Sequence, residues 1–389
     1  MFKVRTYNQI SPLGLNRFAP EQYQVSPDVT DPDAFILRSH KLHGEAIPNS
    51  VLAVARAGAG VNNIPVADYS AKGVVVFNTP GANANAVKEL IAAALLLSSR
   101  DIFGGMNYVQ SLTDMTDAGE MSRLLEKEKK RFAGSELLGK TLGVVGLGAI
   151  GSMVANMALE LGMNVAGYDP ALSVEAAWRL SSRVEKMDSL QSLLAKSDYV
   201  TLHVPAIEAT KHLINADTVK FFKPGAKLLN FAREEIVEPT ALVAALDAGQ
   251  LAGYTADFPT PDLLGRKNVL LMPHIGASTA EAEENCAMMA ADQLMDFLQN
   301  GNIKNSVNFP ATAMARSGGY RITFSNENVP KVLGNVLGIL SESNNNVIDL
   351  VNKSRDNLAY NIIDVEDAPS PDTLERIAAV EGVIRLRVL

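Results

Sequence analysis

Several side chains suited to acid–base chemistry stand just behind apolar stretches in the second half of the chain. Arg233 and His274 each follow a short apolar run that the sequence predicts to be a strand, and Asp257 and Asp262 follow a third such run. Ligands of open α/β sheets bind beyond the carboxyl ends of the strands. We therefore expect these residues to meet at one edge of a parallel sheet.

The residue types at this edge suit the interconversion of a ketone and an alcohol. A protonated His274 can give a proton to the developing alkoxide while a hydride is added to carbon. A nearby carboxylate raises the pKa of the histidine and fixes its ring, and Asp262 is predicted for this role with Asp257 as the competitor. Arg233 can bind a substrate carboxylate and polarise the carbonyl.

Plainer interpretations compete with these roles. Arg233 could instead form an ion pair with Glu234 or Glu235 at a helix start. His203, at a predicted strand end, is expected near a cofactor without acting as an acid. No third ligand accompanies the pair His40 and His43, so no metal site is expected. Three histidines are expected to be ordinary surface or core residues: His40, His43 and His212.

The elements that position these residues include a glycine-rich turn. The apolar run 142–145 leads into Gly146-x-Gly148-x-x-Gly151, followed by a helix-like segment and a strand that ends at Asp169. This order is typical of a dinucleotide site: the glycines allow a tight turn, close approach to a pyrophosphate and close helix packing. The helix start presents free N–H groups to the anion. Asp169 can accept hydrogen bonds from a ribose and would repel a 2′-phosphate, which favours NAD over NADP.

Composition limits the function classes. The 389 residues carry 35 basic and 43 acidic side chains, a net charge of −8, and 47% are hydrophobic. Nucleic acid and anionic membranes are therefore not expected as partners, whereas a small anionic substrate is compatible. A single cysteine, Cys286, fits a reducing cytoplasm. Residues 1–12 lack a signal-peptide pattern, and the apolar run 90–97 is too short to span a bilayer.

Apolar runs alternate with helical or loop segments along most of the chain, which predicts an α/β fold with a parallel sheet. Long helices are expected at 84–99 and 279–299, an exposed helix within 111–130, and a polar linker at 301–319. The last 70 or so residues instead predict a βαββαβ order, a small ferredoxin-like module. Strands are expected near Val4 and at 35–37, 52–55, 74–77, 199–204, 227–232, 254–257 and 269–272.

Several stretches together resemble the D-isomer-specific 2-hydroxyacid dehydrogenase family, and within it the branch that acts on 3-phospho-D-glycerate. They read ARAGAGVNNI from Ala55, NTPGANANAVKEL from Asn78, ELLGKTLGVVGLGAIG from Glu136, LHVPAIEAT from Leu202, LLNFAREEIVEPTAL from Leu228 and NVLLMPHIGAST from Asn268. The resemblance implies a Rossmann-type NAD domain (93–277) inserted in a flavodoxin-like substrate domain (1–92 and 278–312), followed by an ACT-like module (318–389).

The resemblance assigns the catalytic roles to Arg233, Asp262 and His274. Two departures accompany it, because Asp262 stands where the family has a longer glutamate and Glu234 replaces a glycine. The implied cofactor contacts are Thr79, Gly146, Gly148, Ala149, Ile150, Gly151, Asp169, Val204, Pro205, Phe231, Ala232, Arg233, Asp257, His274, Gly276 and Ala277. The implied substrate contacts are Arg56, Ala57, Gly58 and Arg233, with Arg131, Lys130, Arg38 or Lys41 on a phosphate.

The implied reaction is NAD-dependent oxidation of 3-phospho-D-glycerate to 3-phosphohydroxypyruvate by a homodimer or homotetramer. Other substrates remain open, namely hydroxypyruvate, glyoxylate or 2-oxoglutarate, and so does a non-catalytic, NAD-responsive binding protein. The ACT-like module implies an L-serine site shared by two copies, with Lys331 in place of a glycine. The implied effector contacts are Asn326, Asn328 and Asn346.

Overall fold

A computed structural model describes the backbone of residues 1–389 and the side chains of all of them except Glu175. The chain forms two compact units. Unit 1 contains Met1–Asn83 and Thr279–Leu389, and unit 2 contains Ala84–Ser278. Unit 2 is therefore an insertion in the sequence of unit 1. None of the described helices is long and apolar enough to span a membrane.

Unit 1 is built on a parallel sheet in the strand order β2-β1-β3-β4-β5. Every residue of β3 and β5 is buried, as expected for strands covered on both faces. The bounds are β1 Phe2–Thr6, β2 Tyr23–Ser26, β3 Ala34–Leu37, β4 Ala53–Arg56 and β5 Val75–Phe77, with helices α1 Pro12–Leu15, α2 Val66–Ala71 and α10 Ala280–Asn300.

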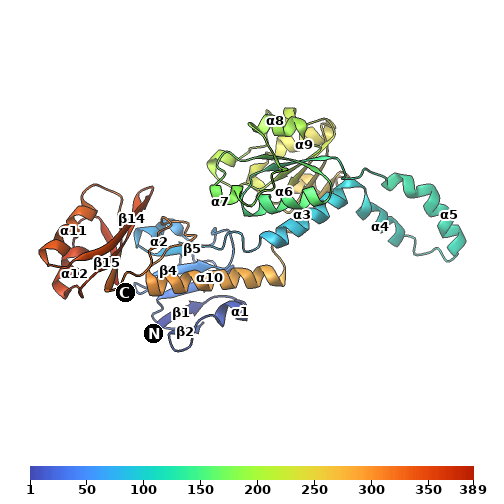
Figure 1. Cartoon of the computed structure of the whole chain (residues 1–389). Coiled ribbons are helices and arrows are strands. Elements are labelled where there is room, and N and C mark those ends of the chain that lie inside the picture. Colours follow the sequence, from blue (N-terminus) through green and yellow to red (C-terminus); the bar gives the residue numbers. More distant parts are fainter. The chain divides into compact units, whose positions relative to one another are not determined.

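Helix α10 is the long helix of unit 1 (Figure 1). The Thr279 hydroxyl caps its start by accepting a hydrogen bond from the Ala282 N–H, and Gly301 ends it with φ +71°. Its buried face, with Phe297 at its end, packs in one cluster with Phe77 and other strand residues. Its predicted position is confirmed within one residue. Strand β2 was not predicted, because Tyr23 is the one fully buried residue in its short edge sequence.

Unit 2 contains a second parallel sheet, in the order β12-β11-β10-β9-β6-β7-β8. The order reverses between β6 and β9, which makes this the switch point where open α/β sheets bind ligands. The strand bounds are β6 Thr141–Val145, β7 Asn164–Tyr168, β8 Glu185–Lys186, β9 Tyr199–Leu202, β10 Ala226–Asn230, β11 Leu251–Ala256 and β12 Val269–Leu271.

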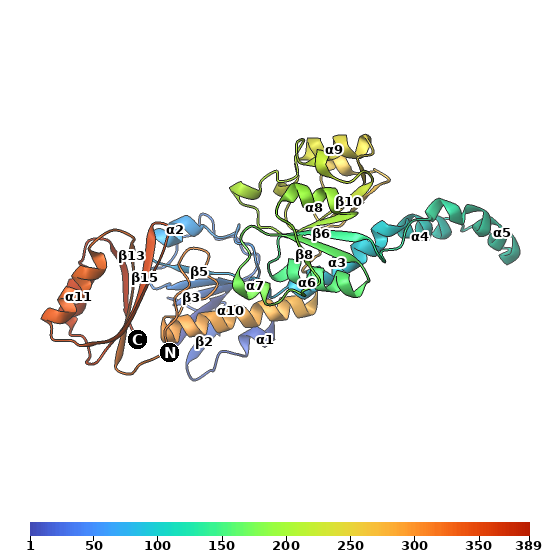
Figure 2. The same cartoon turned by 45° about the horizontal axis from the view of Figure 1, so that its top comes forward.

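Helices of unit 2 fall into two groups. Helix α3 packs against α6 and contacts β10 and β11, whereas α4 and α5 extend away from the sheet as an arm (Figures 1 and 2). Helix α3 has the predicted bounds. The helices are α3 Ala84–Ser99, α4 Ile102–Gln110, α5 Ala118–Glu128, α6 Ala149–Glu160, α7 Val174–Ala177, α8 Leu190–Lys196 and α9 Pro239–Asp247, with a 3-10 turn at Lys129–Phe132.

Residues 320–389, here called the C-terminal module, form an antiparallel sheet in the order β14-β15-β13-β16. Helices α11 and α12 cover one face of it around a separate hydrophobic cluster. The predicted βαββαβ order of elements is present. The bounds are β13 Tyr320–Glu327, α11 Val332–Glu342, β14 Val347–Arg355, β15 Leu358–Val365, α12 Pro371–Ala378 and β16 Val383–Val388.

Candidate active site

The glycine turn after β6 has the backbone geometry that a dinucleotide requires. Gly146 has φ +88°, and a Cβ atom there would lie 2.6 Å from the carbonyl oxygen of His203. A Cβ atom at Gly151 would lie 1.9 Å from the carbonyl oxygen of Gly146, so helix α6 can approach the turn this closely because residue 151 is glycine. At Gly148 an added Cβ would meet none of the described atoms within 4 Å. The turn is therefore tight inside and open on the side where a pyrophosphate would approach.

Asp169 lies directly after β7 and next to this turn. One carboxylate oxygen accepts a hydrogen bond from the Leu147 N–H at 2.8 Å, and the other accepts one from the Ala171 N–H at 2.9 Å. Each oxygen keeps a further lone pair for another donor. The bond to Leu147 is an unpredicted role, because it ties the acidic residue to the turn that would hold the phosphates.

Strand register places the predicted site residues at one edge of the unit 2 sheet. Arg233, Asp257 and His274 follow the neighbouring strands β10, β11 and β12. The last paired residues form a continuous row across the sheet: Tyr168, Val145, Leu202, Asn230, Ala256 and Leu271. Ala149 and Ile150 begin α6, and the other predicted cofactor contacts of unit 2 follow strands at the same edge: Val204, Pro205, Phe231, Ala232, Gly276 and Ala277.

Asp257 supports the loop that carries His274. It is 2% exposed, and its two oxygens accept hydrogen bonds from the N–H groups of Ile275 at 2.8 Å and Gly276 at 2.7 Å. His274 itself is exposed, with φ +56° and its ring 4.8 Å from that of Phe258. With its oxygens engaged by the loop, Asp257 is a poor candidate for the carboxylate that orients the imidazole.

Asp262 is exposed on the 3-10 turn Pro261–Leu263, whose Leu263 is buried. Its backbone carbonyl accepts a hydrogen bond from Arg266 Nε at 3.0 Å. No hydrogen bond or ion pair joins its carboxylate to His274 in the described structure. Aspartate is one methylene shorter than glutamate, so the contact requires the turn to move closer or a water to bridge the two groups.

Arg233 is half-buried and stands at the start of a 3-10 turn, Glu234–Ile236. Its Nη1 donates to the Ala232 carbonyl at 2.6 Å, and its own carbonyl accepts a hydrogen bond from Asn230 Nδ2 at 2.8 Å. The described residues form no ion pair between Arg233 and Glu234 or Glu235. The guanidinium therefore lacks the local carboxylate that would have given it a purely structural role.

His203 lies beneath the glycine turn. Its Nε2 is 2.9 Å from the Thr201 hydroxyl, and its Nδ1 is buried without a hydrogen-bond partner among the described residues. Burial lowers the pKa of this histidine to about 3. The ring is therefore neutral at physiological pH, which supports a packing role beneath the glycine turn rather than that of a proton donor.

The substrate contacts implied in unit 1 lie at the carboxyl end of β4. Arg56 Nε donates to the Arg38 carbonyl at 3.0 Å. The Ala57 N–H donates to the Leu37 carbonyl at 2.7 Å, and the Gly58 N–H donates to the Arg56 carbonyl at 2.9 Å. In this conformation the Ala57 and Gly58 amides already donate hydrogen bonds to carbonyls of the chain. They would have to give up these bonds to donate to a substrate carboxylate.

Thr79 is fully buried, and its N–H donates to the Gly58 carbonyl at 3.0 Å. Its hydroxyl also lies beside the buried Cys286 thiol, whose pKa is raised by burial and lowered to a smaller extent by Thr79. The thiol is therefore protonated at neutral pH, and this corner of unit 1 is closely packed.

The candidate phosphate cations differ in their surroundings. Arg38 pairs with Glu283 at 2.6 Å. Arg131 pairs with Glu128 at 2.7 Å and lies over the Tyr108 ring at 5.3 Å. Lys41 and Lys130 are exposed. Each arginine would have to share or exchange a carboxylate partner to bind a phosphate.

One cluster at the unit 1 edge was missed from the sequence. The His40 ring stacks on Tyr7 at 4.3 Å, and its Nε2 lies 2.8 Å from Glu45. Tyr7 follows β1 and His40 follows β3, which are neighbouring strands. The sequence could have indicated this cluster, because Tyr7 and His40 each stand just after a predicted strand. In the described part of the chain, no group of three or more His, Cys, Asp or Glu is arranged to hold a metal ion.

The three asparagines implied as effector contacts do not gather in one place. Asn326 is 4% exposed, its Oδ1 accepts from Asn361, and its Nδ2 donates to the Glu327 carbonyl. It is therefore occupied inside the sheet. Asn328 follows β13 and Asn346 precedes β14, and the pairing of both strands with β15 puts these residues at opposite ends of the sheet.

Lys331 adopts φ +77°, the left-handed conformation for which the implied glycine is suited. Lysine keeps this conformation at a cost of about 1–2 kcal/mol. The departure from the family pattern therefore places a strained residue at the start of α11.

The fold and the glycine turn define an α/β protein with a dinucleotide-binding domain. Residues 102–276 match the model of the D-isomer specific 2-hydroxyacid dehydrogenase NAD binding domain. A D-3-phosphoglycerate dehydrogenase of Haemophilus influenzae is 33% identical over 89% of this chain and 82% of its own. That of Escherichia coli K12 is 32% identical over 97% of this chain and 92% of its own. The chain belongs to the D-isomer-specific 2-hydroxyacid dehydrogenase family.

Other relatives and solved structures agree with this assignment. A D-3-phosphoglycerate dehydrogenase of Synechocystis is 36% identical over 72% of this chain, which spans about half the length of that relative. D-mandelate dehydrogenase of Rhodotorula graminis has a TM-score of 0.67 at 25% identity, covering 81% of this chain and 99% of its own. NAD+-bound 3-phosphoglycerate dehydrogenase of Entamoeba histolytica has a TM-score of 0.60 at 25% identity, covering 79% and 98%.

Proposed function

We propose that this chain oxidises 3-phospho-D-glycerate to 3-phosphohydroxypyruvate with NAD. The relatives that it resembles over most of its length are D-3-phosphoglycerate dehydrogenases. One structural observation carries the chemistry. Arg233 and His274 lie beyond strands β10 and β12, on either side of β11, at the edge that also holds the glycine turn.

The residues divide the reaction between them. His274 takes the proton of the substrate hydroxyl, and Arg233 holds the carboxylate and polarises the forming carbonyl. Asp262 stabilises the imidazolium once its turn has moved toward His274. NAD held at the glycine turn Gly146–Gly151 would supply the acceptor for the hydride that leaves C2. The first N–H groups of α6 have no acceptor within the helix and suit the pyrophosphate.

Replacing the proposed base tests this chemistry directly. His274→Ala should lower turnover with phosphohydroxypyruvate and NADH by at least ~100-fold, the usual size of an acid–base contribution. His43→Ala is the matched control, because His43 is exposed and contacts the Asn62 carbonyl. Near wild-type turnover in His274→Ala would remove this residue from the mechanism. NADH binding without turnover in the unaltered protein would favour the non-catalytic alternative.

The substrate is tested by comparing matched oxo-acids with and without a phosphate. Phosphohydroxypyruvate should have a kcat/KM at least ~100-fold higher than hydroxypyruvate, because a bound phosphate adds charge-assisted hydrogen bonds. Equal values would reject the phosphorylated substrate, and glyoxylate and 2-oxoglutarate would then be compared. Arg38 and Arg131 remain the proposed phosphate cations, with Arg56 on the carboxylate.

We also propose the finer domain assignments. The parallel order β2-β1-β3-β4-β5 supports a flavodoxin-like substrate domain, and the C-terminal βαββαβ order supports an ACT-like module. An L-serine site would need two copies of the module, since Asn328 and Asn346 lie at opposite ends of one sheet. Millimolar L-serine should inhibit the wild type and spare Asn346→Ala. Calorimetry without serine binding would end this proposal.

A homo-oligomer is supported by helix α4 in the arm. Phe103 is 58% exposed and Met106 is 62% exposed, so the helix presents apolar side chains to solvent. Light scattering should give at least twice the mass of one chain. Phe103→Ser with Met106→Ser should shift the protein toward a monomer, whereas a monomeric wild type would contradict the proposal.

A further inference from the structure

Two consecutive residues after β11 both contact the loop that carries His274. Asp257 accepts hydrogen bonds from the N–H groups of Ile275 and Gly276 at 2.8 and 2.7 Å, which fixes the loop backbone. Phe258 lies against the His274 side chain, with the two ring centres 4.8 Å apart and the ring planes inclined by 51°. One strand end therefore holds both the backbone and the side chain of this loop.

The Phe258 ring is the only aromatic, hydrogen-bonding or ionic partner of the His274 ring among the described residues. The His274 side chain is exposed, and no hydrogen bond or ion pair joins either ring nitrogen to a described residue. A side chain that is free to turn has several staggered orientations open to it. Only an orientation that points a ring nitrogen at the substrate hydroxyl can serve the proposed proton transfer. The ring therefore needs a partner that limits its rotation before the substrate binds.

A phenyl ring suits this position chemically. Tilted ring pairs with centres about 4.5–7 Å apart are favourable, and an aromatic ring also attracts a cation such as the imidazolium that forms during the reaction. Phenylalanine has no group that could donate or accept the transferred proton. Both nitrogens of His274 therefore stay free, one for the substrate hydroxyl and the other for Asp262. Phe258 is itself half-buried, so its own ring is restricted by the surrounding chain.

We propose that Phe258 is a positioning residue, which sets the orientation of the His274 ring for proton transfer. The proposal rests on the proposed function, because the useful orientation is defined by the substrate hydroxyl. It assigns different tasks to the two partners of the base. Phe258 orients the ring in the free enzyme, where the described Asp262 forms no hydrogen bond or ion pair with it. Asp262 stabilises the charge once its turn has moved closer.

Histidine signals in the nuclear magnetic resonance spectrum test the ring contact without any substrate. The chain has five histidines, and the ring signal that is missing in His274→Ala identifies His274. Phe258→Leu should displace that signal, because the aromatic ring beside it is lost, and Phe258→Tyr should leave it near its wild-type position. An unmoved His274 signal in Phe258→Leu would overturn the proposal, whether or not the protein turns over phosphohydroxypyruvate. A wild type that turns over no oxo-acid would instead reject the proposed function, even if the signal moves.

Steady-state kinetics with phosphohydroxypyruvate and NADH test whether the orientation matters for turnover. Phe258→Leu should lower kcat by about tenfold and change KM by less than about twofold, because the substrate still binds but meets a misdirected acid–base group. In the His274→Ala background the same substitution should change kcat by less than about twofold, since the ring that Phe258 orients is absent. Phe258→Tyr should keep at least about half of the wild-type kcat, because it keeps the ring. Equal losses from Phe258→Leu in the two backgrounds would overturn the proposal.

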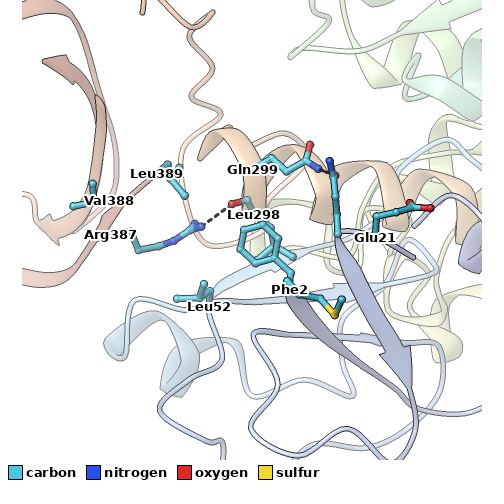
Figure 3. Close-up of a pocket in the computed structure, with 10 residues that line it drawn as sticks. Phe2, Glu21, Leu52, Leu298, Gln299, Arg387, Val388 and Leu389 are labelled. Carbon is cyan, nitrogen blue, oxygen red and sulfur yellow. Dashed lines mark hydrogen bonds between the residues drawn. The ribbon is translucent and has the colours of Figure 1, made fainter. Parts of the chain in front are cut away.

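Phe2→Leu is the matched control for the loss of a phenyl ring. Phe2 is also half-buried and makes a tilted ring contact, with Tyr23 at 5.7 Å and 30°. It lines an open groove of about 780 Å³ in unit 1 (Figure 3). Phe2 stands at the amino end of β1, whereas ligands of such sheets bind beyond the carboxyl ends of the strands. The kcat of Phe2→Leu should therefore stay within about twofold of the wild type.

A second ringless variant guards against a folding defect. Phe258→Met replaces the ring by a flexible apolar chain and should match Phe258→Leu in both readouts. It carries the same comparison if the leucine variant folds poorly. A wild-type kcat in both ringless variants would overturn the proposal.

Discussion

The buried carboxylate of Asp257 holds Gly276 by a 2.7 Å hydrogen bond, and its second oxygen holds the preceding amide at 2.8 Å. These bonds fix the turn in which His274 adopts φ +56°. A Cβ atom at Gly276 would lie 3.0 Å from the same carboxylate, so the loop can come this close because that residue is glycine. Asp257 thus positions the loop that carries the proposed base.

Replacing this aspartate should damage both stability and catalysis. In Asp257→Asn an NH2 group must face one of the two backbone N–H donors, which leaves a buried polar group unsatisfied. We expect a loss of about 1.5–3 kcal/mol in the stability of unit 2 and a parallel fall in kcat. Thermal unfolding and NADH kinetics measure the two effects. Asp217→Asn, an exposed residue paired with Lys220, is the control, and equal melting temperatures for the two variants would contradict the expectation.

The length of the acid at position 262 gives a second prediction. Asp262→Ala should lower kcat by at least ~10-fold. The loss should be smaller than in His274→Ala, because Asp262 affects the reaction only by stabilising the charged His274 ring. Asp262→Glu should retain turnover, since the longer side chain reaches further toward His274. Melting temperatures should hardly change, because Asp262 is exposed. An unaltered kcat in Asp262→Ala would exclude this carboxylate from the mechanism.

Cofactor choice should depend on the charge of Asp169. The wild type should use NADH with a kcat/KM at least ~100-fold above that for NADPH, because the carboxylate beside the turn repels a 2′-phosphate. Asp169→Asn should narrow this ratio while lowering the affinity for both, since it also weakens the bond to Leu147. Steady-state kinetics with both cofactors measure the ratio. Equal use of both by the wild type would refute the prediction.

Burial of His203 predicts an acid-sensitive fold. Its pKa is lowered to about 3 in the folded chain, compared with an ordinary value of about 6.5. Above pH 6.5 the ring is neutral in both states, so its contribution is fully present there. As the pH falls below 6.5 the unfolded chain binds the proton and the folded chain does not, so stability is lost progressively toward pH 3.

His203→Gln should flatten this pH dependence, with the change seen in melting temperatures between pH 7.5 and 4.5. The control His43→Gln replaces an exposed histidine and should follow the wild-type curve. A His203→Gln curve as steep as that of the wild type would show that other groups cause the acid sensitivity.

Local sequence was sufficient for the glycine turn. The requirement for φ above zero at Gly146 and for a missing Cβ at Gly151 arises between neighbours in the chain, so residue type reports it directly. The edge position of Arg233, Asp257 and His274 was predictable for a similar reason. Parallel strands carry their carboxyl ends at one edge, and each residue follows its strand closely.

The partner of each polar side chain was decided by the tertiary structure. Asp257 accepts hydrogen bonds from loop amides, and Asn326 accepts one from Asn361 on the neighbouring strand. The Ala57 amide donates to the Leu37 carbonyl. Which donor meets which acceptor depends on differences of a few tenths of an ångström in the distances between segments far apart in the chain. Periodicity and residue type carry no information on those distances.

The sequence by itself therefore determined the class of fold, the cofactor turn and the edge at which the chemistry should occur, because these follow from local backbone constraints and strand order. The tertiary structure alone showed that the apparent linker before the C-terminal module is clasped by Arg321 and Asp364. Glycine residues allow many backbone conformations, but the packing around them decides whether the chain can still move among these conformations. A Cβ atom at residue 319 would lie 2.0 Å from the Val365 carbonyl oxygen. Gly319 is therefore needed for this close contact between chain segments.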